Sequence, residues 1–353
     1  MLIRILEAAK EVEIKKVEVN CFMNMFDKRI ELLEGLALAV KLKDKTITKE
    51  EVEDIDFVEY NDLPYVNELL EKIDLKKYPE LTSYILDIND CSWYTELHLY
   101  FDNEFNYKEN CNLGVFTSKN IGDFANLVKK IYDSENIEQI FVKYSPFLAN
   151  VSRVYNDLYK FDKQKVREEY SLLFKVPEDV TFDSKITILA NGGFSATKGN
   201  ELACIKGIGA NLDVLRNRRE SILITIYHEF AHHFANPIVD KNFELIPNKE
   251  YLFQESLASG LPVPYQNIIT IFYEYFVRAL SIIYTKDKVS SAEITAEIEY
   301  FKEIGFVRSE DIIEIIENGM KNNQSFEEIL KTDLCQYFAN VDKNFGNSQR
   351  TRN

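Results

Sequence analysis

Hydrophobic positions recur with a helical period along most of the chain. After Asp27, whose side chain suits the start of a helix, apolar residues return every three or four positions as far as Val40. Arg29 and Glu31 fall outside that apolar set, so we expect them on a solvated face. Similar patterns predict helices over 27–40, 66–73, 78–88, 121–132, 135–144, 146–173, 249–259, 267–284, 292–304, 309–320 and 326–338.

The pattern changes to short strands near residue 180, where Asn191-Gly192-Gly193 is a turn signal. The predicted strands are 17–21, 185–190, 194–197 and 202–208, and the segment 92–101 fits either a helix or a strand. The fold class we predict is α+β, predominantly helical, with a small sheet ahead of the next helix. We expect a mainly helical N-terminal region at 1–175, a second region at 176–345 packed with it as one unit, and a polar tail at 346–353.

The helix after this sheet has an unusual composition. It is predicted to begin near 216–221 and to end before Pro237, because proline does not continue a helix. Its central stretch, ILITIYHEFAHHF, carries no formal charge apart from Glu229. Burying a glutamate without a partner costs on the order of several kcal/mol, because its carboxylate loses its hydration. This cost argues against the alternative of a core helix whose histidines bind only their neighbours.

His228, Glu229 and His232 spell H-E-x-x-H within that stretch. Residues four apart lie on one face of a helix, so the two imidazoles can bind one metal ion from the same side. The glutamate beside the first histidine can then act as the base for a metal-activated water. The motif therefore predicts a catalytic zinc site.

A catalytic zinc usually takes three protein ligands, so one more is needed. His98 is the remaining histidine of the chain and is expected to be a core residue. The x-x-G-x-x-H extension is absent, because Ala235 and Ile238 occupy its glycine and histidine positions. A carboxylate is therefore expected, and the possible ligands are Glu244, Glu250, Glu255 and Glu274. Glu274 is favoured because it lies in an apolar helix one turn before Arg278, and Glu255 is the main alternative.

Three segments carry a family resemblance: FDKRIELLEGLALA near the start, HEFAHHFANP in the middle, and EYFVRA in the later apolar helix. With them the chain resembles the gluzincins over roughly residues 20–285. More closely, it resembles a bacterial family known as a domain of unknown function with predicted metallopeptidase character. The resemblance implies a zincin-like catalytic region with an edge strand beside the cleft. It also implies His228, His232 and Glu274 as zinc ligands and Glu229 as the base.

Charge and cysteine content narrow the possible partners and the compartment. The net charge of −16 disfavours nucleic acid and anionic membrane surfaces, which attract basic proteins. The five cysteines form no C-x-x-C pair, so neither a disulfide scaffold nor a cysteine zinc site is expected. No membrane span is expected, because no uninterrupted apolar stretch reaches about 18 residues. The start of the chain does not resemble a signal peptide, so we expect a cytoplasmic protein, or a secreted one if the natural N-terminus was trimmed.

The function predicted from these features is a zinc metallopeptidase acting on a peptide or protein substrate, with Zn²⁺ as its cofactor. A second electrophile must stabilise the oxyanion, and Tyr265 is the favoured residue. The others considered are Tyr227, His233, Tyr273 and Arg278. The alternative functions are a non-catalytic metal-binding or regulatory protein and a hydrolase of non-peptide amides. No oligomeric state is predicted.

Overall fold

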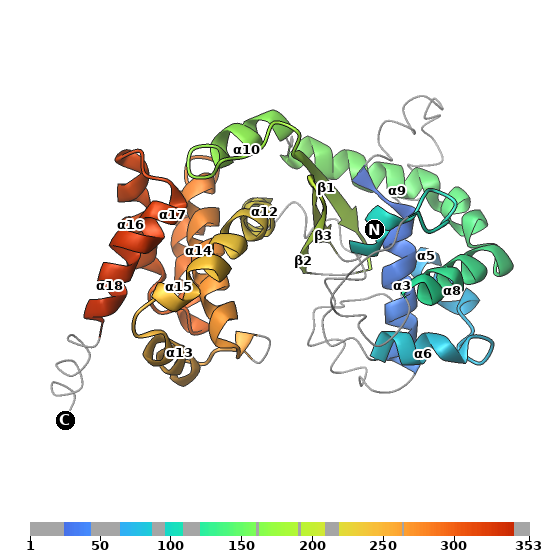
Figure 1. Cartoon of the computed structure of the whole chain (residues 1–353). Coiled ribbons are helices and arrows are strands. Elements are labelled where there is room, and N and C mark those ends of the chain that lie inside the picture. The colour runs from blue at the N-terminus through green and yellow to red at the C-terminus, as the bar shows by residue number, and fades with distance from the viewer. Residues whose placement is uncertain are drawn as a thin grey trace. The chain divides into compact units, whose positions relative to one another are not determined.

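The computed structural model describes residues 25–43, 64–86, 96–108, 121–159, 162–189, 192–208, 219–262 and 265–341. The chain divides into two compact units, each of two segments (Figure 1). Unit 1 contains Met1–Phe161 and Asp183–Arg219, and unit 2 contains Asp162–Phe182 and Glu220–Asn353. The strand predicted at 17–21 lies outside the described residues. The division of the chain near residue 175 stays a prediction.

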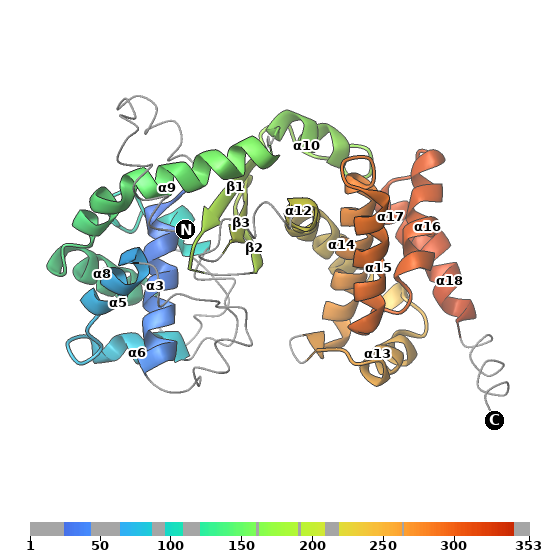
Figure 2. The same ribbon diagram turned by 180° about the vertical axis from the view of Figure 1, so that it is seen from behind.

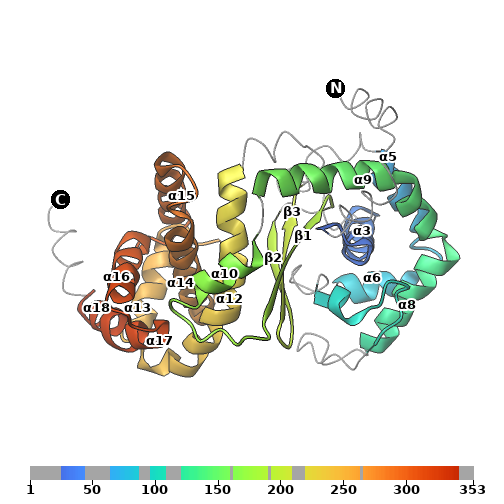
Figure 3. The ribbon, with the colours of Figure 1, turned by 90° about the horizontal axis from the view of Figure 1, so that it is seen from above.

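Unit 1 is built around helix α3 (Lys28–Lys43), which contacts helices from three later segments (Figure 3). The other helical elements of this unit are α5 (Pro64–Lys72), α6 (Pro79–Leu86), the 3-10 turn η3 (Leu97–Tyr100), α8 (Ile121–Ser134) and α9 (Ile137–Tyr159). Asp27 caps α3 as predicted, because its Oδ1 accepts the Arg29 backbone N–H at 2.9 Å. The apolar positions of α3 are buried, so this helix forms the centre of the unit.

The prediction that Glu31 faces solvent is wrong, because its side chain is fully buried within unit 1. Its Oε1 accepts the Ile188 backbone N–H at 2.9 Å, and its Oε2 accepts the Tyr65 hydroxyl at 3.0 Å. Arg29 is also turned inward and donates to the Phe101 carbonyl at 2.7 Å. Helix α3 is therefore covered on its polar side as well as on its apolar side.

A three-stranded sheet follows the helices of unit 1, in the order β1-β3-β2. Its strands are β1 (Thr181–Thr187), β2 (Gly193–Lys198) and β3 (Glu201–Gly207). Strands β2 and β3 are antiparallel, with Ser195 opposite Cys204. Gly199 has a φ of +57° in the two-residue connection between them, a conformation that favours glycine. The predicted fold class, predominantly helical α+β with a small sheet before the H-E-x-x-H helix, is confirmed.

Unit 2 is helical (Figure 2). Its helices pack through many aromatic rings. Its elements are α10 (Lys163–Tyr170), α12 (Arg219–Asn242), the 3-10 turn η5 (Phe243–Leu245), α13 (Lys249–Ala258), α14 (Ile268–Thr285), α15 (Ser291–Glu303), α16 (Ser309–Lys321), α17 (Phe326–Ile329), the π-helical turn η7 (Leu330–Leu334) and α18 (Cys335–Asn340). Helix α14 contacts α13 and α16. Tyr170 packs against Tyr227 of α12 and Tyr284 of α14, with ring centroids 6.2 and 4.6 Å away.

Two prolines lie inside helices that were predicted to end or break there. Helix α12 continues through Pro237 to Asn242, and α9 continues through Pro146. Proline has no N–H to donate to the carbonyl four residues earlier, but in α9 the Ser145 hydroxyl donates to that carbonyl, Val142 O, at 2.9 Å. In α12 the turn beyond the proline carries buried Val239, so tertiary packing overrides the local preference.

Helix α14 corrects the expectation that no apolar stretch of the chain reaches about 18 residues. Its 18 residues have a mean hydropathy of 1.3, which is long and apolar enough to cross a membrane by these measures alone. However, 78% of this window is buried within the protein, as in a core helix. The helix also carries Glu274 and Arg278, two charged residues whose side chains are buried among those of the unit.

Candidate metal centre

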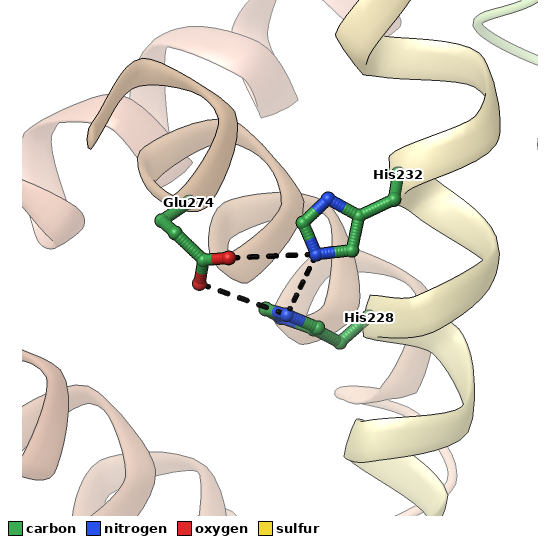
Figure 4. A group of neighbouring side chains, drawn as sticks. All are labelled: His228, His232 and Glu274. Atoms are coloured by element: carbon green, nitrogen blue, oxygen red, sulfur yellow. Dashed lines mark hydrogen bonds and ion pairs between the residues drawn. The ribbon is translucent and has the colours of Figure 1, made fainter. Parts of the chain in front are cut away.

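Helix α12 presents His228 and His232 on one face, as their spacing predicts (Figure 4). Their Nε2 atoms lie 3.2 Å apart, and their rings are inclined at 82°. Both side chains are partly accessible, with 15% and 19% of their surface exposed. Two imidazole nitrogens thus converge on one point that a small ion can reach.

The opposite side of α12 fixes the orientation of this pair. Tyr227 and Phe230 are buried, and Phe230 packs edge-to-face against Phe182 with 5.2 Å between ring centroids. The Tyr170 hydroxyl donates to the Tyr227 backbone carbonyl in the same turn as the first histidine. Because these contacts anchor the far face, the helix cannot turn its histidines away without losing buried aromatic area.

Helix α14 supplies the third member of the group. Glu274 Oε1 lies 3.5 Å from His232 Nε2, and Glu274 Oε2 lies 3.7 Å from His228 Nε2. The glutamate comes from a helix that begins well after α12 ends, and only 8% of its side chain is exposed. Among the described residues, these three form the group of side chains that could hold a metal ion.

The other carboxylates considered as third ligands lie elsewhere. Both oxygens of Glu255 bind the Arg308 guanidinium, with Nε to Oε2 at 2.8 Å and NH2 to Oε1 at 2.5 Å. Glu244 is exposed and pairs with Lys249 at 2.7 Å. Glu250 is also exposed. The structure therefore groups Glu274, rather than these residues, with the two histidines.

The spacing of the three side chains is close to that of a tetrahedral site for a metal such as zinc. Bonds of 2.0–2.1 Å at tetrahedral angles separate neighbouring ligand atoms by about 3.3–3.4 Å. The two Nε2 atoms here lie 3.2 Å apart, and Glu274 approaches His232 at 3.5 Å through Oε1 and His228 at 3.7 Å through Oε2. With one ligand atom taken from each residue, the three atoms lie within 4.8 Å of one another. Glu274 Oε2 is buried and receives no hydrogen bond, which leaves an acceptor that a cation would satisfy. Two imidazoles and one carboxylate are also a usual donor set for zinc.

Two neighbouring residues support this group. Asn236 Oδ1 lies 3.3 Å from His232 Nδ1, so an Nδ1–H can be held there while Nε2 faces the centre. Asn236 was not among the residues predicted from the sequence. Its i+4 position relative to His232 on the same helix is the feature that could have identified it. Arg278 pairs with Glu274, with NH2 2.9 Å from Oε2, as its position one turn later suggested.

Glu229 and the possible oxyanion donors differ in their surroundings. Glu229 is buried, with 8% of its surface exposed. Tyr227 is bound to Glu169 at 2.5 Å, and Tyr273 is bound to Asp240, so both hydroxyls are engaged away from the metal group. Tyr265 instead lies 3.5 Å from the Arg278 guanidinium.

The pKa of Tyr265 is raised, first by burial and then by the negative charge of Glu274, with a further contribution from Glu229. Its hydroxyl therefore keeps its proton at neutral pH and can donate a hydrogen bond. The same contributions indicate that Tyr265 lies within electrostatic range of both carboxylates.

The remaining histidines are not members of the metal group. His98 is buried in unit 1, with 1% of its surface exposed, as the sequence predicted for a core residue. His233 packs edge-to-face against Phe234. Burial lowers the pKa of His233, so the neutral imidazole is favoured.

Comparison with known proteins gives one match. Residues 200–340 are similar to the family described as Domain of unknown function (DUF4932). The matched region contains His228, His232 and Glu274, whereas the FDKRIELLEGLALA segment lies outside it. No curated protein and no solved structure matches the chain significantly.

Proposed function

We propose that the protein is a zinc-dependent hydrolase of peptide bonds, a metallopeptidase of the gluzincin type. His228, His232 and Glu274 would hold the zinc. The observation that carries the proposal is the convergence of two imidazole nitrogens and one carboxylate at separations of 3.2–3.7 Å. The glutamate next to the first histidine completes the H-E-x-x-H pattern, in which it serves as a base.

Bound zinc would supply a Lewis acid that makes water more acidic and polarises the scissile carbonyl. Glu229 would remove the proton from the attacking water and then deliver it to the leaving amine. Tyr265, which keeps its proton, would donate a hydrogen bond to the oxyanion of the tetrahedral intermediate. The partial exposure of both imidazoles is consistent with a site that a substrate can reach.

The test compares wild type with Glu229→Gln for zinc content and for hydrolysis of a peptide library analysed by mass spectrometry. We expect both proteins to hold one zinc and the variant to lose about 10²- to 10⁴-fold in rate, because its amide cannot accept the proton. Asp240→Asn is the matched control, since Asp240 is an exposed acid on the same helix. It should retain activity close to that of wild type.

Three outcomes would contradict the proposal in different ways. Zinc binding with unchanged hydrolysis in Glu229→Gln would exclude Glu229 as the base. A zinc-loaded wild type that cleaves no peptide would favour the alternative functions, a non-catalytic metal-binding protein or a hydrolase of non-peptide amides. A wild type that binds no zinc would remove the proposal altogether.

A further inference from the structure

Arg278 and Glu274 form a buried ion pair at the edge of the metal group. They lie one turn apart on α14, with NH2 to Oε2 at 2.9 Å, and their side chains are 9% and 8% exposed. An ion pair that is removed from water is costly to desolvate, so its geometry must be well supported. The surroundings of Arg278 show what supports it.

Three aromatic rings enclose the guanidinium group. Its central carbon lies 4.6 Å from the ring centroid of Phe306, 5.0 Å from that of Phe301 and 5.5 Å from that of Tyr265. Rings at these distances attract a cation through their negative faces. Among the described ion pairs, Glu274 is the carboxylate that Arg278 contacts. The cation is therefore held by rings from outside α14 and directed at one carboxylate.

The contact leaves the carboxylate free to bind a metal. Although Arg278 NH2 is 2.9 Å from Glu274 Oε2, neither Oε2 nor the Arg278 Nε makes a hydrogen bond. The guanidinium thus attracts the carboxylate by charge without directing an N–H along an oxygen lone pair. The charge of Arg278 thus restrains the flexible side chain of Glu274, while the Glu274 oxygens still face His228 and His232.

We propose that Arg278 is a positioning residue, which holds Glu274 in the orientation that completes the metal group. The inference rests on the proposed function, in which Glu274 is a zinc ligand. Arg278 touches neither the metal nor the substrate in this assignment. Its effect is exerted through the carboxylate and is therefore measured on metal affinity rather than on turnover alone.

The test measures the zinc dissociation constant of the full-length protein by competition with a chromophoric chelator. Arg278→Met keeps the length and apolar character of the side chain but removes the charge. We expect zinc affinity to fall about 10- to 100-fold, as is typical when a residue that orients a metal ligand is lost. Arg308→Met is the matched control, because Arg308 pairs with the buried carboxylate of Glu255 in the same unit but outside the metal group. It should stay within about threefold of wild type.

A second variant covers the case in which Arg278→Met does not fold. Phe306→Leu retains both charges and removes the ring nearest the guanidinium, so we expect a loss of about three- to tenfold in zinc affinity. In whichever variant folds, the visible absorption spectrum of bound Co²⁺ should also change, because it reports on coordination geometry. A merely structural role would not alter that spectrum.

The outcomes separate this inference from the proposed function. Wild-type protein that binds zinc, with Arg278→Met within about threefold of it, would overturn the positioning role and leave the metal site intact. If Arg278→Met does not fold, a zinc affinity of Phe306→Leu within about threefold of wild type would overturn the positioning role instead. Wild-type protein that binds no zinc would overturn both.

Discussion

Glu274 and Glu255 are both buried glutamates on helices that follow α12, and their partners distinguish them. Arg308 donates to both oxygens of Glu255 in a two-point contact, so each oxygen has a charged hydrogen-bond donor. Glu274 has an oxygen without a hydrogen-bond donor and faces two imidazole nitrogens. Arg308 satisfies Glu255 by hydrogen bonds, whereas Arg278 pairs with Glu274 by charge and leaves one of its oxygens without a hydrogen bond.

This difference leads to a prediction for paired substitutions. Glu274→Gln should lose stoichiometric zinc, because a neutral amide is a poor zinc ligand. Glu255→Gln should keep its zinc but lose about 2–3 kcal/mol of unfolding free energy, because the half-buried Arg308 loses its charged partner. Zinc content after gel filtration and urea unfolding of each variant would measure both effects. Loss of zinc in Glu255→Gln alone would reverse the assignment of the third ligand.

The residues of the metal group could be predicted because the signals that mark them are local. The i, i+4 spacing of the histidines needs only a helix, and a glutamate in an apolar helix needs a partner wherever it lies. Glu31 could not be predicted to be buried, because its partners come from Tyr65 and from the backbone of Ile188. A solvated glutamate and a buried one have the same local sequence pattern when the partners are distant.

At the scale of elements, the turn between α15 and α16 places Phe306, the ring nearest the Arg278 guanidinium. Gly305 lies in this turn with a φ of +94°, and the next residue, Phe306, donates its N–H to the Phe301 carbonyl at 2.8 Å. A Cβ on Gly305 would lie 2.8 Å from the Ser256 backbone carbonyl oxygen. The turn therefore packs directly against the C-terminal end of α13, and the position of Phe306 depends on that close approach.

Two glycine substitutions separate close packing from backbone conformation. Gly260 has a similar φ of +97°, but a Cβ there would come no nearer than 3.6 Å to another atom. Gly260→Ala should therefore cost only the conformational strain, about 1–3 kcal/mol. Gly305→Ala should cost a further 1–3 kcal/mol or so from overpacking, and it should weaken zinc binding by shifting Phe306. Equal unfolding free energies and equal zinc affinities for the two variants would contradict this account.

Most helices were predicted within a few residues, because long apolar periods and end signals were consistent. Asn267 caps α14, and Gly260 follows α13 in a positive-φ conformation. The helix predicted at 146–173 is instead the end of α9, which stops at Tyr159, followed by α10, which begins at Lys163. Two further errors occurred at Pro146 and Pro237. Proline was expected to end a helix, but a nearby hydroxyl in one case and downstream packing in the other allow the helix to continue.

At the scale of the whole molecule, the two units contain different buried acids. Unit 2 holds Glu274 beside the histidines, whereas unit 1 holds Glu31 and Glu34 on α3, where no metal group is found among the described residues. Burial raises the pKa of Glu31 to about 7, against the opposing hydrogen bonds from Thr187, Ile188 and Tyr65. Burial also raises the pKa of Glu34 to about 8, and one of its oxygens lacks a hydrogen-bond partner.

The raised pKa values predict how the stability of unit 1 depends on pH. The folded state binds these protons more tightly than the unfolded chain, whose carboxyl pKa is near 4.5. The stabilisation is therefore complete below that value and is lost as pH rises through about 7 and 8. Glu34→Gln stays neutral at this position, so it should not show the Glu34 part of the wild-type loss in unfolding free energy between pH 6 and 9, roughly 2–3 kcal/mol.

Hydrogen exchange of the α3 amides, corrected for the intrinsic pH dependence of exchange, would measure this difference. Glu71→Gln is the control, because Glu71 is exposed on α5 in the same unit and should leave the wild-type pH dependence unchanged. Two results would contradict the prediction: wild-type α3 amides that stay protected up to pH 9, or Glu34→Gln amides that lose protection to the same extent as wild type. Either result would mean that Glu34 is already ionised at neutral pH and has a cationic partner. If the prediction holds, the stability of unit 1 falls over the pH range in which its buried glutamates ionise, independently of zinc binding at the metal group of unit 2.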